Sequence, residues 1–158
     1  MKNLNNTKAS AGLTMIEVLV AVVILSIGLL GVAGLQVTGM RNNNSANLRT
    51  QASILASEFG DILRSNKTAV DAGDFDGPFD TSNLSISVEP NCRTINGTCS
   101  TTEMADTSIV DWGTDVAARL PDGVGTTART GDIFTVTITW LDDRNNNATV
   151  AFITEFQP

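Results

Sequence analysis

The sequence of 158 residues contains no histidine and only two cysteines, Cys92 and Cys99. Histidine is the usual side chain for acid–base catalysis near neutral pH, and no serine or cysteine has a plausible base beside it. A structural zinc site needs four ligands, which two cysteines without histidine do not supply. The sequence therefore predicts a protein that is not an enzyme, with no catalytic residues, no metal site and no cofactor.

Basic residues are scarce as well. The chain has 10 Lys and Arg against 17 Asp and Glu, which gives a net charge of −7. Loss of a leader that contains Lys2 and Lys8 would bring the net charge from −7 to −9. Nucleic-acid binding depends on basic contacts to phosphate groups. This charge balance excludes nucleic acid as a partner, and solubility accounts for the scattered acids.

One long stretch, by contrast, has almost no polar side chains. Residues 18–35 carry no charge, and Ser26 is their only polar residue. Eighteen apolar or small residues in a row are enough for a helix that crosses a bilayer. Lys2 and Lys8 precede this run, which by the positive-inside rule places the leader in the cytoplasm and the bulk of the chain outside it.

A single acid, Glu17, lies at the start of this apolar run. An ionisable group inside a membrane costs roughly 2.5–3.5 kcal/mol, so we expect Glu17 to have a function. An ordinary secretory signal cleaved near residues 31–33 and a plain signal anchor are the competing interpretations. Glu17 and a helical pattern that continues well beyond residue 33 argue against the secretory signal, whereas the signal anchor would make Glu17 an accidental acid.

The N-terminal residues resemble a known export signal. A short basic leader, then Gly12, Leu13-Thr14-Met15-Ile16-Glu17 and the apolar run are similar to the class III signal of type IV prepilins and pseudopilins. The resemblance implies that a prepilin peptidase cuts between Gly12 and Leu13 and that the new amino group of Leu13 is methylated. The family usually has Phe at the first mature position, and Leu13 is a mild departure. The resemblance also implies an assembly role for Glu17.

Helical periodicity continues past the apolar run. An apolar residue recurs every three or four positions at Leu48, Ala52, Leu55, Phe59 and Ile62. This pattern predicts one helix over residues 14–65, whose last third packs on a soluble domain. Glycines at positions 28, 31, 34 and 39 each weaken a helix by about 1 kcal/mol. They let neighbouring helices approach closely, let the segment unwind, or simply reflect the frequency of small residues in membrane helices.

The rest of the chain alternates between loop, helix and strand signals. Residues 67–82 are rich in Asp and Gly and predict a loop. Residues 84–88 alternate between apolar and polar side chains and predict a strand that ends at Pro90. Residues 100–103 have the spacing of a capping box, and helical intervals follow as far as Leu120, with Gly113 as a weak point. Alternation over residues 134–140 and 148–156 predicts an antiparallel hairpin with a polar tip at 142–147.

Two acidic segments have some character of calcium loops. Residues 74–77 read Asp-Phe-Asp-Gly, and the hairpin tip carries Asp143, Asn145 and Asn147. Both lack further ligands of an EF-hand loop, and Ala148 stands where the tip would need its glycine. We therefore predict a solvated turn at the hairpin tip and treat residues 74–77 as part of the predicted loop.

The two cysteines predict a disulfide. An exported domain lies in an oxidising compartment, where Cys92 and Cys99 are expected to pair. The closed loop is short, so loop-closure entropy contributes roughly 2–2.5 kcal/mol of stability.

Sheet and helix must bury their apolar faces against each other, which predicts an α+β fold. In this fold a long N-terminal helix packs on a small antiparallel β-sheet, an arrangement that resembles the pilin fold. The expected boundaries are 1–12 for the leader, 13–36 for the transmembrane and assembly half of the helix, 37–66 for its amphipathic half and 67–158 for the globular head.

Within the pilins the chain is most similar to the PilV family of minor pilins (type IV pilus modification proteins). The likeness rests on the segments 13–20, 26–31, 33–36, 99–112, 120–123 and 136–140. It implies a single-pass subunit of the inner membrane with a periplasmic head, which joins a type IV pilus at or near its tip. There it would help to initiate assembly and support twitching motility or adhesion. The implied partners are the prepilin peptidase and other major and minor pilins. The alternatives are a type II secretion pseudopilin and a pilin-like adhesin.

Overall fold

The computed structural model describes residues 14–83, 90–94, 97–142 and 148–158. The helices are α1 (Met15–Ser65), α2 (Lys67–Ala72), the 3-10 helix η1 (Pro90–Arg93) and α3 (Thr101–Arg119). The strands are β1 (Phe79–Asp80), β2 (Val124–Thr130), β3 (Ile133–Asp142) and β4 (Ala148–Phe156). The chain divides into two compact units, residues 1–40 and residues 41–158.

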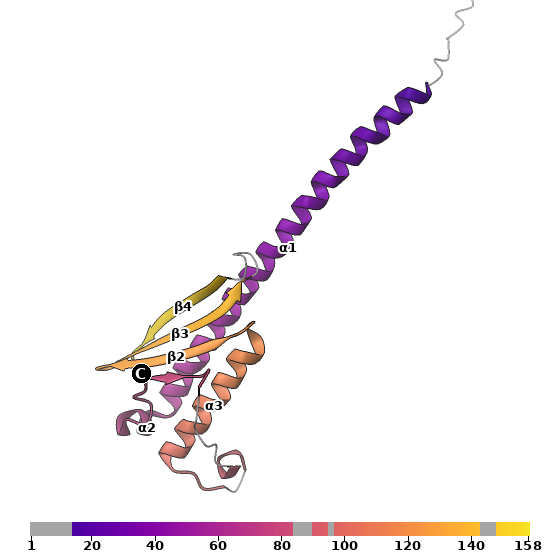
Figure 1. Ribbon diagram of the computed structural model, residues 1–158. Coiled ribbons are helices and arrows are strands. Elements are labelled where there is room, and N and C mark those ends of the chain that lie inside the picture. Colours follow the sequence, from indigo (N-terminus) through magenta and orange to yellow (C-terminus); the bar gives the residue numbers. More distant parts are fainter. Residues whose placement is uncertain (1–13, 84–89, 95–96, 143–147) are drawn as a thin grey trace, which may run out of the picture. The chain divides into compact units, whose positions relative to one another are not determined.

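Helix α1 confirms the long helix that periodicity predicts. It begins at Met15 and ends at Ser65, and its glycines do not interrupt it (Figure 1). In the second unit its apolar stripe enters the core, where Ala52, Leu55 and Phe59 are fully buried. Ile62, the last residue of the stripe, packs against the core and stays partly exposed. The stripe therefore has the core role that its spacing indicates.

Helix α3 begins with the predicted capping box. The Ser100 hydroxyl accepts a hydrogen bond from the Glu103 amide at 3.2 Å, and the Glu103 carboxylate accepts one from the Ser100 amide at 2.7 Å. The Ser100 amide and then its hydroxyl hold the pKa of Glu103 below its usual value, because both donate to the charged carboxylate. The helix continues through Gly113, which is buried, and Leu120 follows as its C-cap. The glycine does not break this helix.

The four strands form one antiparallel sheet in the order β1-β2-β3-β4. One face packs on α1 and α3, and its central row in β3 is buried to 0–1% exposure at Phe134, Val136, Ile138 and Trp140. The predicted hairpin is present, with Phe134 opposite Phe156 at one end of the β3–β4 ladder. Asp142, predicted as the start of the tip, is the last residue of β3, and residues 143–147 lie outside the described residues. The expected α+β arrangement, a long N-terminal helix on a small antiparallel sheet, is confirmed.

Strand β2 was not predicted, and its sequence shows why. Its inward positions are occupied by Gly125 and Thr127, so it lacks the large apolar residues that mark a buried strand. A Cβ built at Gly125 would lie 2.6 Å from Cζ3 of Trp112. The indole ring on α3 therefore fills the space that a side chain of β2 would otherwise take.

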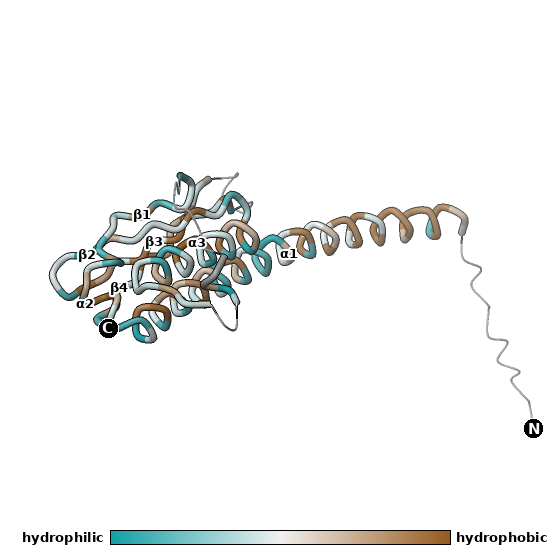
Figure 2. The backbone as a smooth tube through the Cα atoms, turned by 90° about the horizontal axis from the view of Figure 1, so that it is seen from below, coloured by the Kyte–Doolittle hydropathy of each residue, from teal (hydrophilic) through white to brown (hydrophobic). Residues whose placement is uncertain are grey.

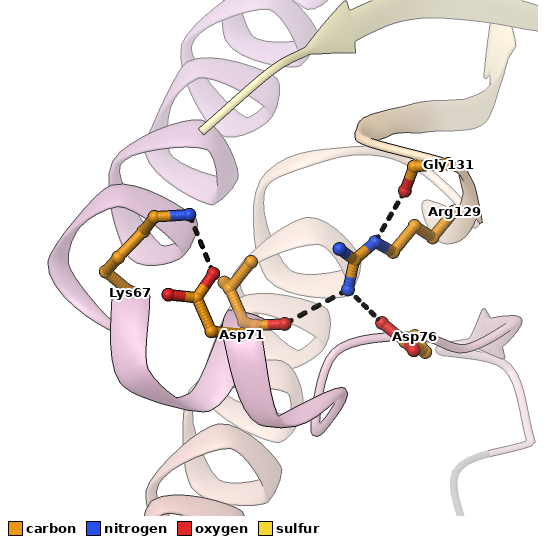
Figure 3. A network of polar contacts seen from close by, with 6 residues as sticks. Lys67, Asp71, Asp76, Arg129 and Gly131 are labelled. Atoms are coloured by element: carbon orange, nitrogen blue, oxygen red, sulfur yellow. Dashed lines mark hydrogen bonds and ion pairs between the residues drawn. The ribbon is translucent and has the colours of Figure 1, made fainter.

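The loop expected over residues 67–82 is partly wrong. The short helix α2 opens this stretch, supported by an ion pair from Lys67 to Asp71 at 2.8 Å and closed by Gly73 in the left-handed conformation. Arg129 of β2 then binds the segment that follows: its guanidinium donates to Asp76 at 2.5 Å and to the carbonyl of Val70 at 3.0 Å (Figure 3). These contacts come from a distant strand, so local composition does not reveal them. The strand predicted over residues 84–88 lies outside the described residues.

The acidic residues of this stretch have contacts within the fold. Asp74 accepts a hydrogen bond from Thr102 at 3.0 Å. Burial, and then the charge of Asp74, raise the pKa of Asp106 on α3. Among the residues that the structure describes, no three acids, cysteines or histidines gather in a group able to hold a metal ion.

Candidate assembly segment

The candidate functional segment is the first unit, in which only one acid interrupts an apolar helix. Glu17 lies in the first turn of α1, where its amide donates to the carbonyl of Thr14 at 3.0 Å. A carboxylate in the first turn is favoured by the partial positive charge of a helix N-terminus. The Glu17 side chain is exposed, and no Lys or Arg of the described chain pairs with it. It is therefore open to a charge from outside the described residues.

The apolar side chains around Glu17 are all on the surface. Every large apolar residue from Met15 to Met40 is at least 49% exposed, and Met15 reaches 87%. The most apolar window of 18 residues in α1 has a mean hydropathy of 2.8, as the colouring of Figure 2 shows. None of the residues in this window is buried. An apolar surface this long marks a membrane or protein contact in an otherwise soluble chain. By length and composition α1 is able to cross a membrane.

Two hydroxyls of this helix, those of Ser26 and Thr38, are satisfied within the helix itself. The Ser26 hydroxyl donates to the carbonyl of Val22 at 2.7 Å, and the Thr38 hydroxyl donates to that of Gly34 at 3.1 Å. Inside a bilayer each unsatisfied polar group costs several kcal/mol. These two hydroxyls therefore do not oppose burial in lipid, and Glu17 is the one charged side chain between Thr14 and Met40.

Four glycines in the described part of the first unit have free space beside them. A Cβ built at Gly28, Gly31, Gly34 or Gly39 finds no atom within 4 Å. Gly60, in the second unit, differs, because a Cβ there would lie 2.7 Å from the ring of Phe156. The fold thus requires Gly60 for packing, whereas the four N-terminal glycines leave shallow positions on an open helix surface.

The remaining predicted site residues lie in two places. Gly12 and Leu13, the proposed cleavage pair, are outside the described residues. Cys92 and Cys99 are joined as a disulfide, with their Cα atoms 5.3 Å apart, between η1 and the start of α3. That separation is ordinary for a disulfide. This geometry permits the predicted Cys92–Cys99 disulfide.

One buried polar contact had no sequence signal. The Ser45 hydroxyl of α1 donates to the carboxylate of Asp142, the last residue of β3, at 2.5 Å. Both side chains are 1% exposed, and they lie 97 positions apart in the sequence. Because the pairing is so distant, neither residue stands out from local composition. Counted from the N-terminus of α1, Ser45 is the first buried residue of that helix.

Comparison with known proteins agrees with the N-terminal signal. A family model for the prokaryotic N-terminal methylation motif matches residues 7–33. This range contains Gly12, Leu13, Glu17 and most of the apolar run. The match indicates a type IV pilin-like prepilin. Searches of curated proteins and of solved structures found no match.

Proposed function

We propose that the chain is a minor pilin of a type IV pilus, similar to the PilV family. It is held in the inner membrane with its head in the periplasm, and it joins the filament at or near the tip, where it helps to initiate assembly. One observation carries this proposal: the methylation motif at residues 7–33 overlaps the start of a helix whose large apolar side chains from Met15 to Met40 are all exposed. The apolar surface of such a helix is covered by lipid before assembly and by the helices of neighbouring subunits in the filament.

Maturation is the first step of the proposed function. A prepilin peptidase cuts between Gly12 and Leu13, and the new amino group of Leu13 is methylated. Residues 13–36 then form the transmembrane and assembly half of the helix, residues 37–66 its amphipathic half and residues 67–158 the head. The pattern of exposure supports this division, because side chains of α1 become buried only from Ser45 onward.

Glu17 is the proposed determinant of docking. Cleavage creates a charged amine at Leu13, four residues before the carboxylate. In a low-dielectric surrounding neither charge is stable alone, whereas a pair offsets much of the cost of desolvation. A neighbouring subunit offers such an amine from its own N-terminus. Glu17 therefore penalises a solitary subunit and favours one that is docked in a fixed axial register.

Type II secretion pseudopilins begin with the same motif. The choice between a minor pilin and a pseudopilin therefore rests on the sequence of the head. The segments 120–123 and 136–140, which resemble PilV proteins, form the C-cap of α3 and the buried part of β3. Gene neighbourhood separates the two systems: we expect pilus assembly genes beside this gene. A neighbourhood of type II secretion genes would replace the pilus with the secretion system and leave the maturation chemistry unchanged.

Intact-mass measurement of the membrane-extracted protein tests the proposal. The expected mass is that of residues 13–158 with one added methyl group. A variant with Gly12→Asp serves as the control and should retain the leader. A mature N-terminus at Gly34 would contradict the pilin assignment and restore an ordinary secretory signal. Detection of the mature protein in sheared pili then tests its place in the filament.

A further inference from the structure

The two edges of the sheet differ in length. β4 forms one edge with nine residues, and no strand of the described chain pairs with its outer side (Figure 1). β1 forms the other edge and consists of Phe79 and Asp80 alone. Unpaired N–H and C=O groups along an edge strand are a template for pairing with another chain. β4 offers a long template and β1 a minimal one.

β4 also lacks the features that protect an edge strand. Between Ala148 and Phe156 there is no Lys and no Pro, and the only charge is that of Glu155. Its register with β3 runs without a skipped residue, so no bulge turns the edge away. On the opposite edge, Pro78 directly precedes the two residues of β1. One edge is thus protected, and the other is left open.

Apolar surface lies on both faces of β4. Ile153 is 63% exposed on the outer face of the sheet. On the inner face Val150, Phe152 and Phe156 pack against the core but stay partly exposed. A strand added beside β4, with apolar residues at alternate positions, would cover the exposed sides of these three residues. The edge therefore offers apolar burial in addition to backbone hydrogen bonds.

We propose that β4 is a strand-addition site for a neighbouring, different pilin-like subunit. The neighbour contributes an extended edge strand with alternating apolar residues, which runs antiparallel to β4. The proposal rests on the proposed function, because the filament supplies the neighbour.

Strand directions agree with this neighbour. Each adjacent pair in the sheet is antiparallel, so β4 runs opposite to β1. A neighbour with the same topology, whose strands run in the same directions, therefore presents its β1-side edge antiparallel to β4. Antiparallel pairing is the slightly more stable arrangement. Antiparallel pairing of β4 with β4 of a second copy instead requires a two-fold axis that reverses the strands of one sheet relative to the other.

Edge length and charge favour a different subunit over a second copy. The β1 edge of this chain provides only two residues to donate. The chain has a net charge of −7, so two copies repel each other. A donor strand with a neutral or basic residue opposite Glu155 avoids a like-charge pair. The expected donor is therefore a pilin-like subunit with a longer β1-side edge and a less acidic head.

Photocrosslinking of the full-length chain in intact cells tests the site. A photoreactive amino acid replaces Thr149, whose side chain is exposed on β4. The expected product is an adduct with a different protein whose N-terminus carries the same matured motif. In the background of Ile153→Lys this adduct should be lost, because an edge lysine resists strand addition. Ile133→Lys is the matched control: Ile133 is 43% exposed on β3, which has strands on both sides, and its adduct should persist.

The outcomes separate this proposal from the proposed function. Wild-type protein that is present in sheared pili without a Thr149 adduct would overturn strand addition alone. An adduct between two copies through β4, an adduct with a protein unrelated to pilins, or an adduct that survives Ile153→Lys would do the same. Absence of the mature wild-type protein from pili would overturn both proposals. Thermal unfolding of the two lysine variants should match that of the wild type, since both positions are exposed.

Discussion

The indole N–H of Trp112 on α3 donates a hydrogen bond to the backbone carbonyl of Leu55 on α1 at 2.8 Å. The same ring lies 4.7 Å from that of Phe59, measured between centroids, and covers Gly125 of β2. One side chain therefore connects both long helices with the sheet.

Replacement of Trp112 by Phe should lower the free energy of unfolding by about 1–3 kcal/mol, because a buried hydrogen bond and part of the ring contact are lost. Trp140→Phe is the matched control. Trp140 is 1% exposed, but its indole nitrogen has no hydrogen-bond partner. Urea denaturation of the solubilised protein, followed by circular dichroism, measures both variants. Equal losses would show that the bond to Leu55 contributes little.

Gly125→Ala should destabilise the head by about 1–3 kcal/mol, since the added methyl group overlaps the buried indole ring. A smaller side chain at position 112 should reduce this cost, so the double variant with Trp112→Leu is expected to be more stable than the sum of the single effects. Gly39→Ala, where a Cβ meets nothing within 4 Å, is the control and should not destabilise the head. Additive effects at positions 125 and 112 would contradict direct overlap.

Local patterns predicted the elements whose contacts are repeated along the chain. The stripe of α1, the capping box of α3 and the alternation of β3 and β4 each repeat over several residues, so the signal accumulates. β2 has no such signal, because Gly125 and Thr127 occupy its inward positions in place of large apolar residues. The ring of Trp112 on α3 fills the space beside Gly125. The contact of Arg129 with Asp76 and the bond between Ser45 and Asp142 depend on pairs that are far apart in sequence. Such pairs appear only once the tertiary structure is known.

The residues of the candidate site were easier to predict from the sequence than the tertiary contacts of the head. Gly12, Leu13 and Glu17 stand in one short linear motif, which needs no tertiary structure to be identified. The exposure of every large apolar side chain from Met15 to Met40 is a finding of the structure. The partner of Glu17 belongs to another molecule in the proposed filament. The sequence therefore identifies Glu17 and its place on the helix, whereas the geometry of its pair with a neighbouring amine depends on the filament.

The cysteines provide a redox prediction. Non-reducing peptide mapping of the exported protein should recover a Cys92–Cys99 linked peptide. Replacement of both by Ser should reduce the free energy of unfolding by roughly 2–2.5 kcal/mol, because the unfolded chain regains the entropy of an open loop. Reductant should lower the stability of the wild type and leave the double Ser variant unchanged. Free thiols in exported protein would contradict the pairing.

Glu17→Ala should still insert in the membrane and still be cleaved after Gly12, but should enter filaments poorly. The reason is that the amine of a neighbouring subunit loses its counter-charge within the bilayer. The ratio of the protein in sheared pili to that in the membrane fraction measures the effect. Ser26→Ala, in the same helix but without a change of charge, should be incorporated normally. Normal incorporation of Glu17→Ala would leave apolar packing alone to drive assembly.

The hydrogen bond from Ser45 to Asp142 has a mechanical consequence. A retracting filament pulls on its subunits, and in the proposed function α1 is the element through which tension reaches the head. The first buried side chain that this tension meets along α1 belongs to Ser45, whose partner ends β3. A hydrogen bond weakens steeply with small changes in distance and angle, whereas apolar contacts yield more gradually. We therefore expect the junction of helix and sheet to stay stiff up to a threshold force and then to open first at this pair.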